Sequence, residues 1–172
     1  MNYDKLHDTH VTGQDEDGFW FGDPCYVVPD HMWEPFCDAW QKYDKQFEDQ
    51  ENFDRHYVAE VHDEETGVGF YSWSTAWGDG TYKLFVNGTK VADLPVDAGT
   101  LSAIPMKLIK HWETQGMLGD YKDLGHVVEA SACDGHIGCS AGDFHWGEVS
   151  LPTGYEDEHE EEDECEEEGF FL

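Results

Sequence analysis

Residues 69–86 read GFYSWSTAWGDGTYKLFV and form the densest aromatic run of the chain. Aromatic residues favour strands, and Gly-Asp-Gly favours a tight turn, so the run predicts two strands joined at residues 78–80. The dipeptide Asn87-Gly88 follows directly, and Asn-Gly between two such runs predicts a β-hairpin that continues into Thr89–Leu94. Short strands and tight turns therefore dominate the centre of the chain.

Further strand-like segments flank this run. Strands are predicted at Phe19–Val28 (bent at residues 22–24), Tyr57–His62, Val96–Ile104 (after an initial turn), His126–Ala132, Ile137–Ala141 and Phe144–Leu151.

Two segments have helical spacing instead. Aromatic residues recur every three or four positions in the first segment, which predicts a helix with one aromatic stripe that ends in the polar stretch Glu48–Arg55. The stripe comprises Trp33, Phe36, Trp40, Tyr43 and Phe47. The second predicted helix has an apolar face of Met106, Ile109 and Trp112 and ends at Gly116.

About eight or nine short strands and two helices predict an α+β fold with a mostly antiparallel, strongly bent sheet or an open barrel. We expect residues 1–17 to be a flexible acidic leader, residues 18–153 to form one globular domain, and residues 154–172 to be a disordered acidic tail with an apolar tip.

The chain of 172 residues has 39 acidic against nine basic residues and a net charge of −30. Residues 154–172 hold 11 of the acids, and the rest of the chain, with 28 acidic and nine basic residues, still carries −19. Such a charge repels phosphate backbones and anionic lipids, so we expect neither duplex DNA nor a membrane as partner. It favours a basic protein partner, or it is a device for solubility or for high salt.

The first 17 residues lack the apolar core of a signal peptide, and no apolar run is long enough to span a membrane, which predicts a cytoplasmic location. The five cysteines are then expected to be reduced thiols.

A Gly-Asp pair precedes an apolar segment at Asp23, Asp79 and Asp143, and Asp97 lies in a similar turn. Aspartate in a turn usually accepts hydrogen bonds from nearby backbone N–H groups. Alternatively, the four carboxylates gather at one end of the sheet, beside Trp73 and Trp77, as a cation or ligand site. Both interpretations stay open.

The segment Cys133–Cys139 has the spacing Cys-x2-His-x2-Cys, which is typical of zinc ligands. If residues 134–135 form a hairpin turn, Cys133 and His136 share one face of the sheet and Cys139 lies on the other. This alternation weakens the case for zinc at Cys133 and His136 and for a Cys133–Cys139 disulfide.

No sequence motif of a serine nucleophile, a phosphate-binding loop or a dinucleotide fold is present, and we predict no cofactor. A cysteine nucleophile at Cys25 is one remaining enzymatic alternative.

The acidic run after Gly154 ends in Phe170, Phe171 and Leu172. Acidic tails with an aromatic tip resemble the C-termini of bacterial and phage single-stranded-DNA-binding proteins, in which the tip docks on a replication partner. The resemblance implies a partner-binding role for these three residues, unless they fold back on the domain.

Three blocks, GDPCYV from Gly22, STAWGDGTY from Ser74 and VDAG from Val96, resemble a family of small, uncharacterised bacteriophage proteins. The resemblance implies a phage or prophage source and no particular activity.

Together these features predict a protein that is not an enzyme and that binds a basic surface of a host or phage protein, such as a nucleic-acid enzyme, as a DNA mimic or inhibitor. The first alternative is a ligand- or cation-binding domain, with or without enzymatic activity, that uses the aspartate turns. The second is a single-stranded-DNA-binding protein.

Overall fold

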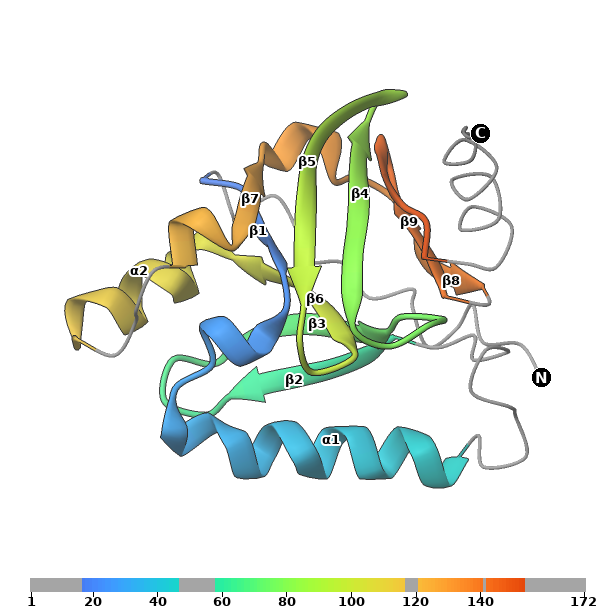
Figure 1. Cartoon of the computed structure of the whole chain (residues 1–172). Coiled ribbons are helices and arrows are strands. Elements are labelled where there is room, and N and C mark those ends of the chain that lie inside the picture. The colour runs from blue at the N-terminus through green and yellow to red at the C-terminus, as the bar shows by residue number, and fades with distance from the viewer. Residues whose placement is uncertain (1–16, 47–57, 117–120, 141, 154–172) are drawn as a thin grey trace, which may run out of the picture.

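The computed structural model describes residues 17–46, 58–116, 121–140 and 142–153 (Figure 1). This part of the chain contains two α-helices and ten strands in two antiparallel sheets that do not close into a barrel. The predicted α+β class is therefore confirmed. None of the described helices has the length and apolar character that crossing a membrane requires.

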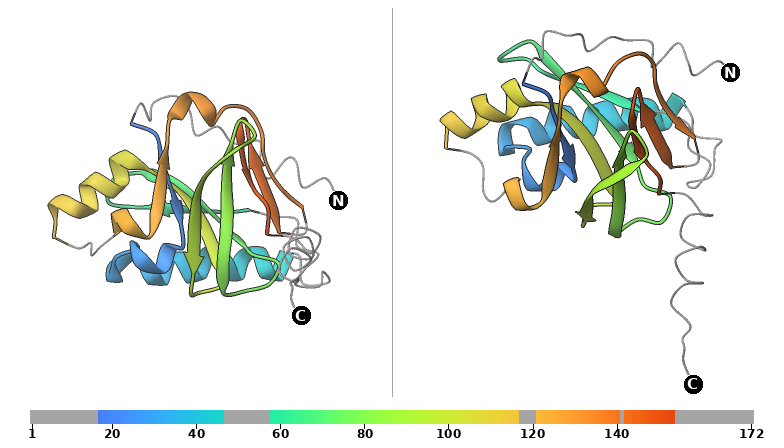
Figure 2. Two further views of the ribbon diagram at one scale, coloured as in Figure 1. Left: turned by 45° about the horizontal axis from the view of Figure 1, so that its top comes forward. Right: turned by 90° about the horizontal axis from the view of Figure 1, so that it is seen from above.

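Sheet A has the strand order β2-β3-β6-β1-β7, and sheet B has the order β5-β4-β10-β9-β8. The strands of sheet A are β1 (Phe19–Gly22), β2 (Ala59–Asp63), β3 (Val68–Ser74), β6 (Thr100–Pro105) and β7 (Gly125–Val128). The strands of sheet B are β4 (Gly80–Val86), β5 (Thr89–Val96), β8 (Ile137–Ser140), β9 (Asp143–Trp146) and β10 (Val149–Leu151). Figure 2 shows β8 and β9 on the side of β4 that faces away from β5, and β10 lies between β4 and β9.

The helices α1 (Trp33–Gln46) and α2 (Met106–Thr114) pack on sheet A, so that the fold has three layers. Figure 1 shows α1 beneath β2 and β3, with β4 and β5 on the opposite side. One buried cluster fills the space between the sheets, and a second fills the space between sheet A and the helices. Side chains of a strand alternate between its two faces, so Phe19 and Phe21 of β1 enter the first cluster and Trp20 enters the second.

The helical stripes pack as their spacing predicts. Phe36 of α1 is buried and stacks on Phe70 of β3 with ring centroids 6.3 Å apart. In α2 the predicted face is buried together with Leu108, and Gly116 adopts φ +73° directly after the helix. The predicted contact of Phe47 and the predicted helix end in Glu48–Arg55 lie outside the described residues.

The Asn87-Gly88 hairpin is confirmed, with β4 and β5 paired and both turn residues at positive φ (53° and 80°). However, the strands on either side of Gly-Asp-Gly do not pair with each other. Strand β3 belongs to sheet A and β4 to sheet B, so residues 75–79 carry the chain from one sheet to the other.

Three predicted strands are wrong in extent. The strand predicted at Phe19–Val28 ends at Gly22, because Asp23 caps a 3₁₀ turn at Pro24–Tyr26. The strand predicted at His126–Ala132 ends at Val128, and Ala130–Ala132 form a 3₁₀ turn. The segment Phe144–Leu151 is two strands, β9 and β10, separated at Gly147, which has φ +61°.

The side chain of Trp20 packs directly against the backbone of sheet A. Its indole N–H donates to the Tyr121 carbonyl (3.1 Å), and its ring covers Gly22 and Gly125, which are paired across β1 and β7. A Cβ atom at Gly125 would lie 2.2 Å from the indole, and one at Gly22 would lie 2.5 Å away. Glycine is therefore required at both positions for steric reasons.

We expect Gly125→Ala to lower the free energy of unfolding by about 1–3 kcal/mol, because the fully buried indole has no space to retreat. Urea denaturation measures the change. Gly69→Ala in β3 is the matched control, since its added Cβ would meet, at 3.1 Å, the ring of the exposed His62, which can move away. Equal losses in the two variants would contradict the steric explanation.

Candidate functional site

The four predicted aspartate turns lie at one end of the molecule, which we call the aspartate-turn end. It comprises Gly22-Asp23, Gly78-Asp79, Asp97–Gly99 and Gly142-Asp143, and a network of hydrogen bonds connects the four turns.

The carboxylate of Asp23 joins the first turn to the third. It is fully buried and accepts hydrogen bonds from the backbone N–H groups of Cys25 (2.8 Å), Asp97 (2.7 Å) and Ala98 (2.8 Å). These donors use both carboxylate oxygens. Asp23 therefore has the structural role that aspartate usually has in turns, and it also links segments 74 residues apart in the chain.

Thr75 joins the second turn to the third. Its backbone N–H donates to the Gly99 carbonyl (3.1 Å), and its hydroxyl accepts from the Gly78 N–H (2.8 Å) and donates to the Gly78 carbonyl (2.7 Å). The Tyr82 hydroxyl donates to the same carbonyl (2.9 Å). The Gly-Asp-Gly turn is thus fixed from both sides.

The fourth turn is attached through Thr153. The carboxylate of Asp143 accepts from the Thr153 N–H (2.9 Å), and the Thr153 hydroxyl donates to the Gly142 carbonyl (2.5 Å) and accepts from the Ala76 N–H (3.0 Å). Ala76 directly follows Thr75, so this contact completes the network.

The two predicted tryptophans lie in different environments. Trp73 is fully buried and stacks on Phe144 with ring centroids 3.7 Å apart, so it is part of the core between the sheets. Trp77 is 46% exposed and lies in the turn beside Asp79. Asp79 and Asp97 are also exposed, and Asp97 accepts a hydrogen bond from the Tyr26 hydroxyl (2.5 Å). We call Trp77, Asp79 and Asp97 the Trp77 patch.

Cys25 is surrounded by three of the predicted aspartates. Burial raises the pKa of its thiol to about 12, and a hydrogen bond to Asp23 and the negative charges of Asp23, Asp97 and Asp79 contribute to the shift. Because the nucleophile is the thiolate, this environment disfavours Cys25 as a catalytic nucleophile at neutral pH.

The predicted hairpin at residues 134–135 does not form. Strand β8 pairs with β9, and β7 pairs with β1, so Cys133 and His136 do not lie on paired strands. Cys133 and Cys139 are both buried in the cluster between the sheets, and His136 is exposed. The prediction that the two cysteines lie on opposite faces is therefore wrong, although the four described cysteines form no disulfide with one another.

A different set of possible metal ligands was not predicted from the sequence. Within the described ranges, His31, Asp63 and Glu65 bring ligand atoms within 4.8 Å of one another, and neither Cys133 nor His136 belongs to this set. The three residues come from two distant segments, since His31 precedes α1 whereas Asp63 and Glu65 lie at the end of β2 and in the turn after it, and they follow no known spacing motif. The predicted partner-binding tip, Phe170, Phe171 and Leu172, lies outside the described residues.

Searches against protein-family models, curated proteins and solved structures give no match.

We expect Asp23→Asn to lower the free energy of unfolding by about 2–4 kcal/mol, because the amide removes the charge and turns an N–H₂ group toward backbone donors. Denaturation followed by tryptophan fluorescence measures the loss. Asp79→Asn, at an exposed position, should change it by less than about 0.5 kcal/mol. Comparable losses would show that the Asp23 hydrogen bonds do not hold this end together.

We expect Cys25 to be alkylated slowly by iodoacetamide at pH 8, because its raised pKa leaves little thiolate. Asp79→Asn should increase the rate, since it removes a charge that raises this pKa, and Asp134→Asn should not. Mass spectrometry of the Cys25 peptide gives the rates, with the exposed Cys37 as internal reference. An unchanged rate in Asp79→Asn would contradict the proximity of Asp79 to Cys25.

Proposed function

We propose that the protein binds a basic surface of another protein through the Trp77 patch. The observation that carries the proposal is that Trp77, Asp79 and Asp97 are all exposed on two turns that hydrogen bonds join and hold in place. Tryptophan is enriched among the residues that dominate binding energy, and its ring face attracts lysine and arginine. Carboxylates beside the ring suit the same basic partner.

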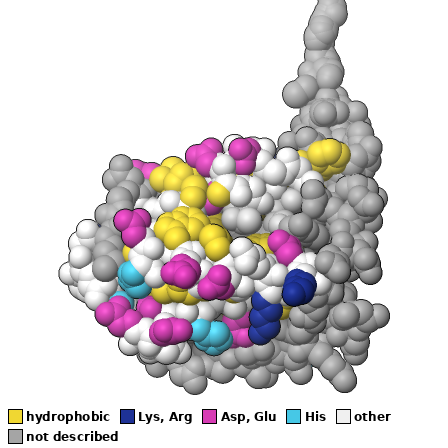
Figure 3. All heavy atoms as spheres, turned by 90° about the horizontal axis from the view of Figure 1, so that it is seen from below, with side chains coloured by type: hydrophobic (Ala, Val, Ile, Leu, Met, Phe, Trp, Pro, Cys, Tyr) yellow, Lys and Arg dark blue, Asp and Glu magenta, His cyan; other side chains and the backbone are white. Residues whose placement is uncertain are grey.

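The rest of the surface supports the proposal. In the described part of the chain, Asp23 and Asp63 are the buried carboxylates, and most of the others are exposed. On the face seen from below, acidic side chains lie around apolar ones, and lysines gather toward one edge (Figure 3). The net charge of −19 on residues 1–153 steers a basic partner toward the protein and repels nucleic acid.

The described part of the chain ends at Thr153, at the aspartate-turn end. Thr153 is bonded to Asp143 and Ala76, so the 11 acids of residues 154–172 follow in sequence from the aspartate-turn end. We propose that the tail assists in binding and that Phe170, Phe171 and Leu172 act as a short linear anchor.

The partner class follows from the charge. A protein surface that attracts this much negative charge is typical of enzymes that hold nucleic acid, and an acidic protein bound there acts as a DNA mimic or inhibitor. The resemblance of the GDPCYV, STAWGDGTY and VDAG blocks to phage proteins supports a partner in the cytoplasm of a bacterial host.

A cation site at the aspartate turns has less support. Asp23 already accepts three N–H groups, and Asp143 accepts the Thr153 N–H. Both carboxylates therefore have structural roles at this end.

The proposal is tested by pull-down from a lysate of the host, with washes at about 0.05 and 0.5 M NaCl. The double variant Asp79→Asn/Asp97→Asn should retain at most about a tenth of the partner that the wild type retains, because it removes the two charges of the Trp77 patch. Trp77→Ala should lose a similar amount, and the higher salt should release the partner from the wild type.

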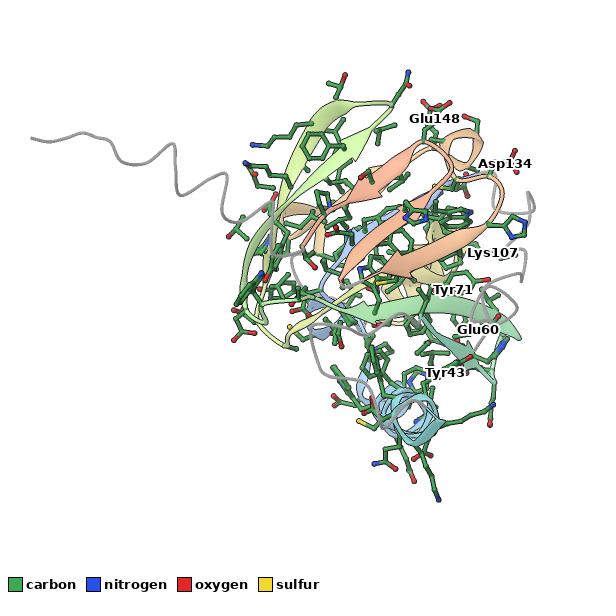
Figure 4. All side chains as sticks on the ribbon, turned by 90° about the vertical axis from the view of Figure 1, so that its right-hand side faces the viewer. Tyr43, Glu60, Tyr71, Lys107, Asp134 and Glu148 are labelled. Carbon is green, nitrogen blue, oxygen red and sulfur yellow. The ribbon has the colours of Figure 1, made fainter. Side chains whose placement is uncertain are left out.

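The matched control is Asp134→Asn/Glu148→Gln, which changes the net charge by the same amount. Figure 4 shows Asp134 and Glu148 together, far from α1. The Glu148 carbonyl accepts from the Asn87 N–H, which places it at the end of β4 opposite to Asp79. Equal retention of the partner by the two double variants, or retention that does not fall at the higher salt concentration, would overturn the proposal.

A further inference from the structure

A set of metal-ligand side chains lies at a different place in the fold, where the start of α1, the β2–β3 turn and α2 meet. His31 lies in the 3₁₀ turn before α1, Asp63 ends β2, and Glu65 is in the turn that follows. Their ligand atoms lie within 4.8 Å of one another. This region is at the left in Figure 1, and Figure 3 shows histidine beside acidic side chains toward the same side.

Asp63 is the fixed member of the set. It is 1% exposed, and its two oxygens accept single hydrogen bonds from the Glu65 N–H (3.1 Å) and the Thr66 hydroxyl (3.2 Å). A carboxylate oxygen can accept two hydrogen bonds or ligate a metal with its remaining lone pair. Within the described ranges no lysine or arginine pairs with Asp63.

Asp63 has fewer and longer hydrogen bonds than Asp23, the other buried carboxylate of the described residues. Asp23 accepts three N–H groups at 2.7–2.8 Å. Asp63 has two longer hydrogen bonds from uncharged donors, and no lysine or arginine of the described ranges pairs with it. Burying a carboxylate is costly unless its charge is paired or it coordinates a metal, so the surroundings of Asp63 suit a cation.

Glu65 is oriented by a second histidine. The Nε2 atom of His111 in α2 lies 3.3 Å from Glu65 Oε1. Metal-ligating groups are commonly held by such outer hydrogen bonds, which fix their direction. His111 is therefore a positioning residue for Glu65.

The surface beside His31 is hollowed. A cavity of about 370 Å³ is lined by Val28, Pro29, Asp30 and His31. A site with three protein ligands is completed by water or another small ligand, and the hollow beside His31 keeps this part of the surface open to solvent.

We propose that His31, Asp63 and Glu65 bind a divalent transition metal of the zinc type. One imidazole and two carboxylates suit zinc and its neighbours better than Ca²⁺ or Mg²⁺, which select oxygen ligands. Zinc bonds of 2.0–2.2 Å place tetrahedral donors about 3.3–3.6 Å apart, so the exposed His31 and Glu65 close on the fixed Asp63 when the metal binds. This site is independent of the proposed partner binding.

The test is a zinc titration of the full chain. Isothermal titration calorimetry measures the binding, and thermal unfolding measures the shift of the midpoint. We expect one strong site whose occupation raises the midpoint, since a ligand of the folded state stabilises it. His31→Ala and Glu65→Gln should each weaken this site at least about tenfold, and His111→Ala should weaken it less than His31→Ala does. Asp63 is left unchanged because its loss alone would destabilise the β2–β3 turn.

The control variant is His62→Ala. His62 neighbours Asp63 in β2, and its Nε2 atom lies 3.5 Å from Glu60 Oε2. His62 is exposed and forms with Glu60 a histidine–carboxylate pair outside the proposed site. The variant His62→Ala keeps the acidic tail, so any weak metal binding by the tail is the same in all variants. Co²⁺ in place of zinc should give the strong visible absorption of a tetrahedral site in the wild type and in His62→Ala, but not in His31→Ala.

Equal zinc affinity in His31→Ala and His62→Ala would overturn the proposal, because the metal would then bind elsewhere. The absence of a strong site in the wild type, or of tetrahedral Co²⁺ absorption, would overturn it as well.

Discussion

The buried carboxylate of Asp23 connects the parts of this fold that the chain itself leaves separate. It lies directly after β1 in sheet A and binds the N–H groups of the turn that leads from β5 in sheet B to β6 in sheet A. Thr75, in the connection from β3 to β4, binds the same turn through Gly99. Two of the connections between the sheets are thus held against each other, and the positions of Trp77, Asp79 and Asp97 follow from these bonds.

This arrangement supports the role that we propose for the Trp77 patch. Side chains on a mobile loop lose conformational entropy when a partner orders them, whereas a fixed turn has lost it already on folding. The charge of the protein acts at longer range and draws basic partners in general. In the proposed binding, the fixed ring of Trp77 would help to distinguish one basic partner from another.

The sequence was sufficient for features that depend on neighbouring residues. The Asn87-Gly88 hairpin and the stripes of both helices need only local spacing and turn chemistry, and all are observed where the structure describes them. The sequence also predicts the Gly-Asp-Gly turn but not the separation of its two strands into different sheets, because a tight turn has the same local sequence whether or not its strands pair. The convergence of the aspartate turns was one of two open alternatives, since turn positions depend on the order of the strands in both sheets.

Other features depend on contacts across the fold and had no local signal. His31 and Asp63 are brought together by the packing of α1 on sheet A, which spacing along the chain does not reveal. The faces of Cys133 and Cys139 were assigned from a hairpin that does not form, because β8 pairs with β9 rather than with the segment before it. Trp73 and Trp77 have similar neighbours in the sequence, but only Trp73 is buried in the core between the sheets.

The third connection between the sheets, from β7 to β8, lies at the opposite end, where the Glu148 N–H binds the Ala132 carbonyl (2.9 Å). The sheets are therefore tied to each other by hydrogen bonds at both ends, on either side of the buried aromatic cluster. Amide hydrogens in the central strands β1 and β6 then exchange with solvent mainly when the whole domain unfolds, so their exchange rates report its global stability.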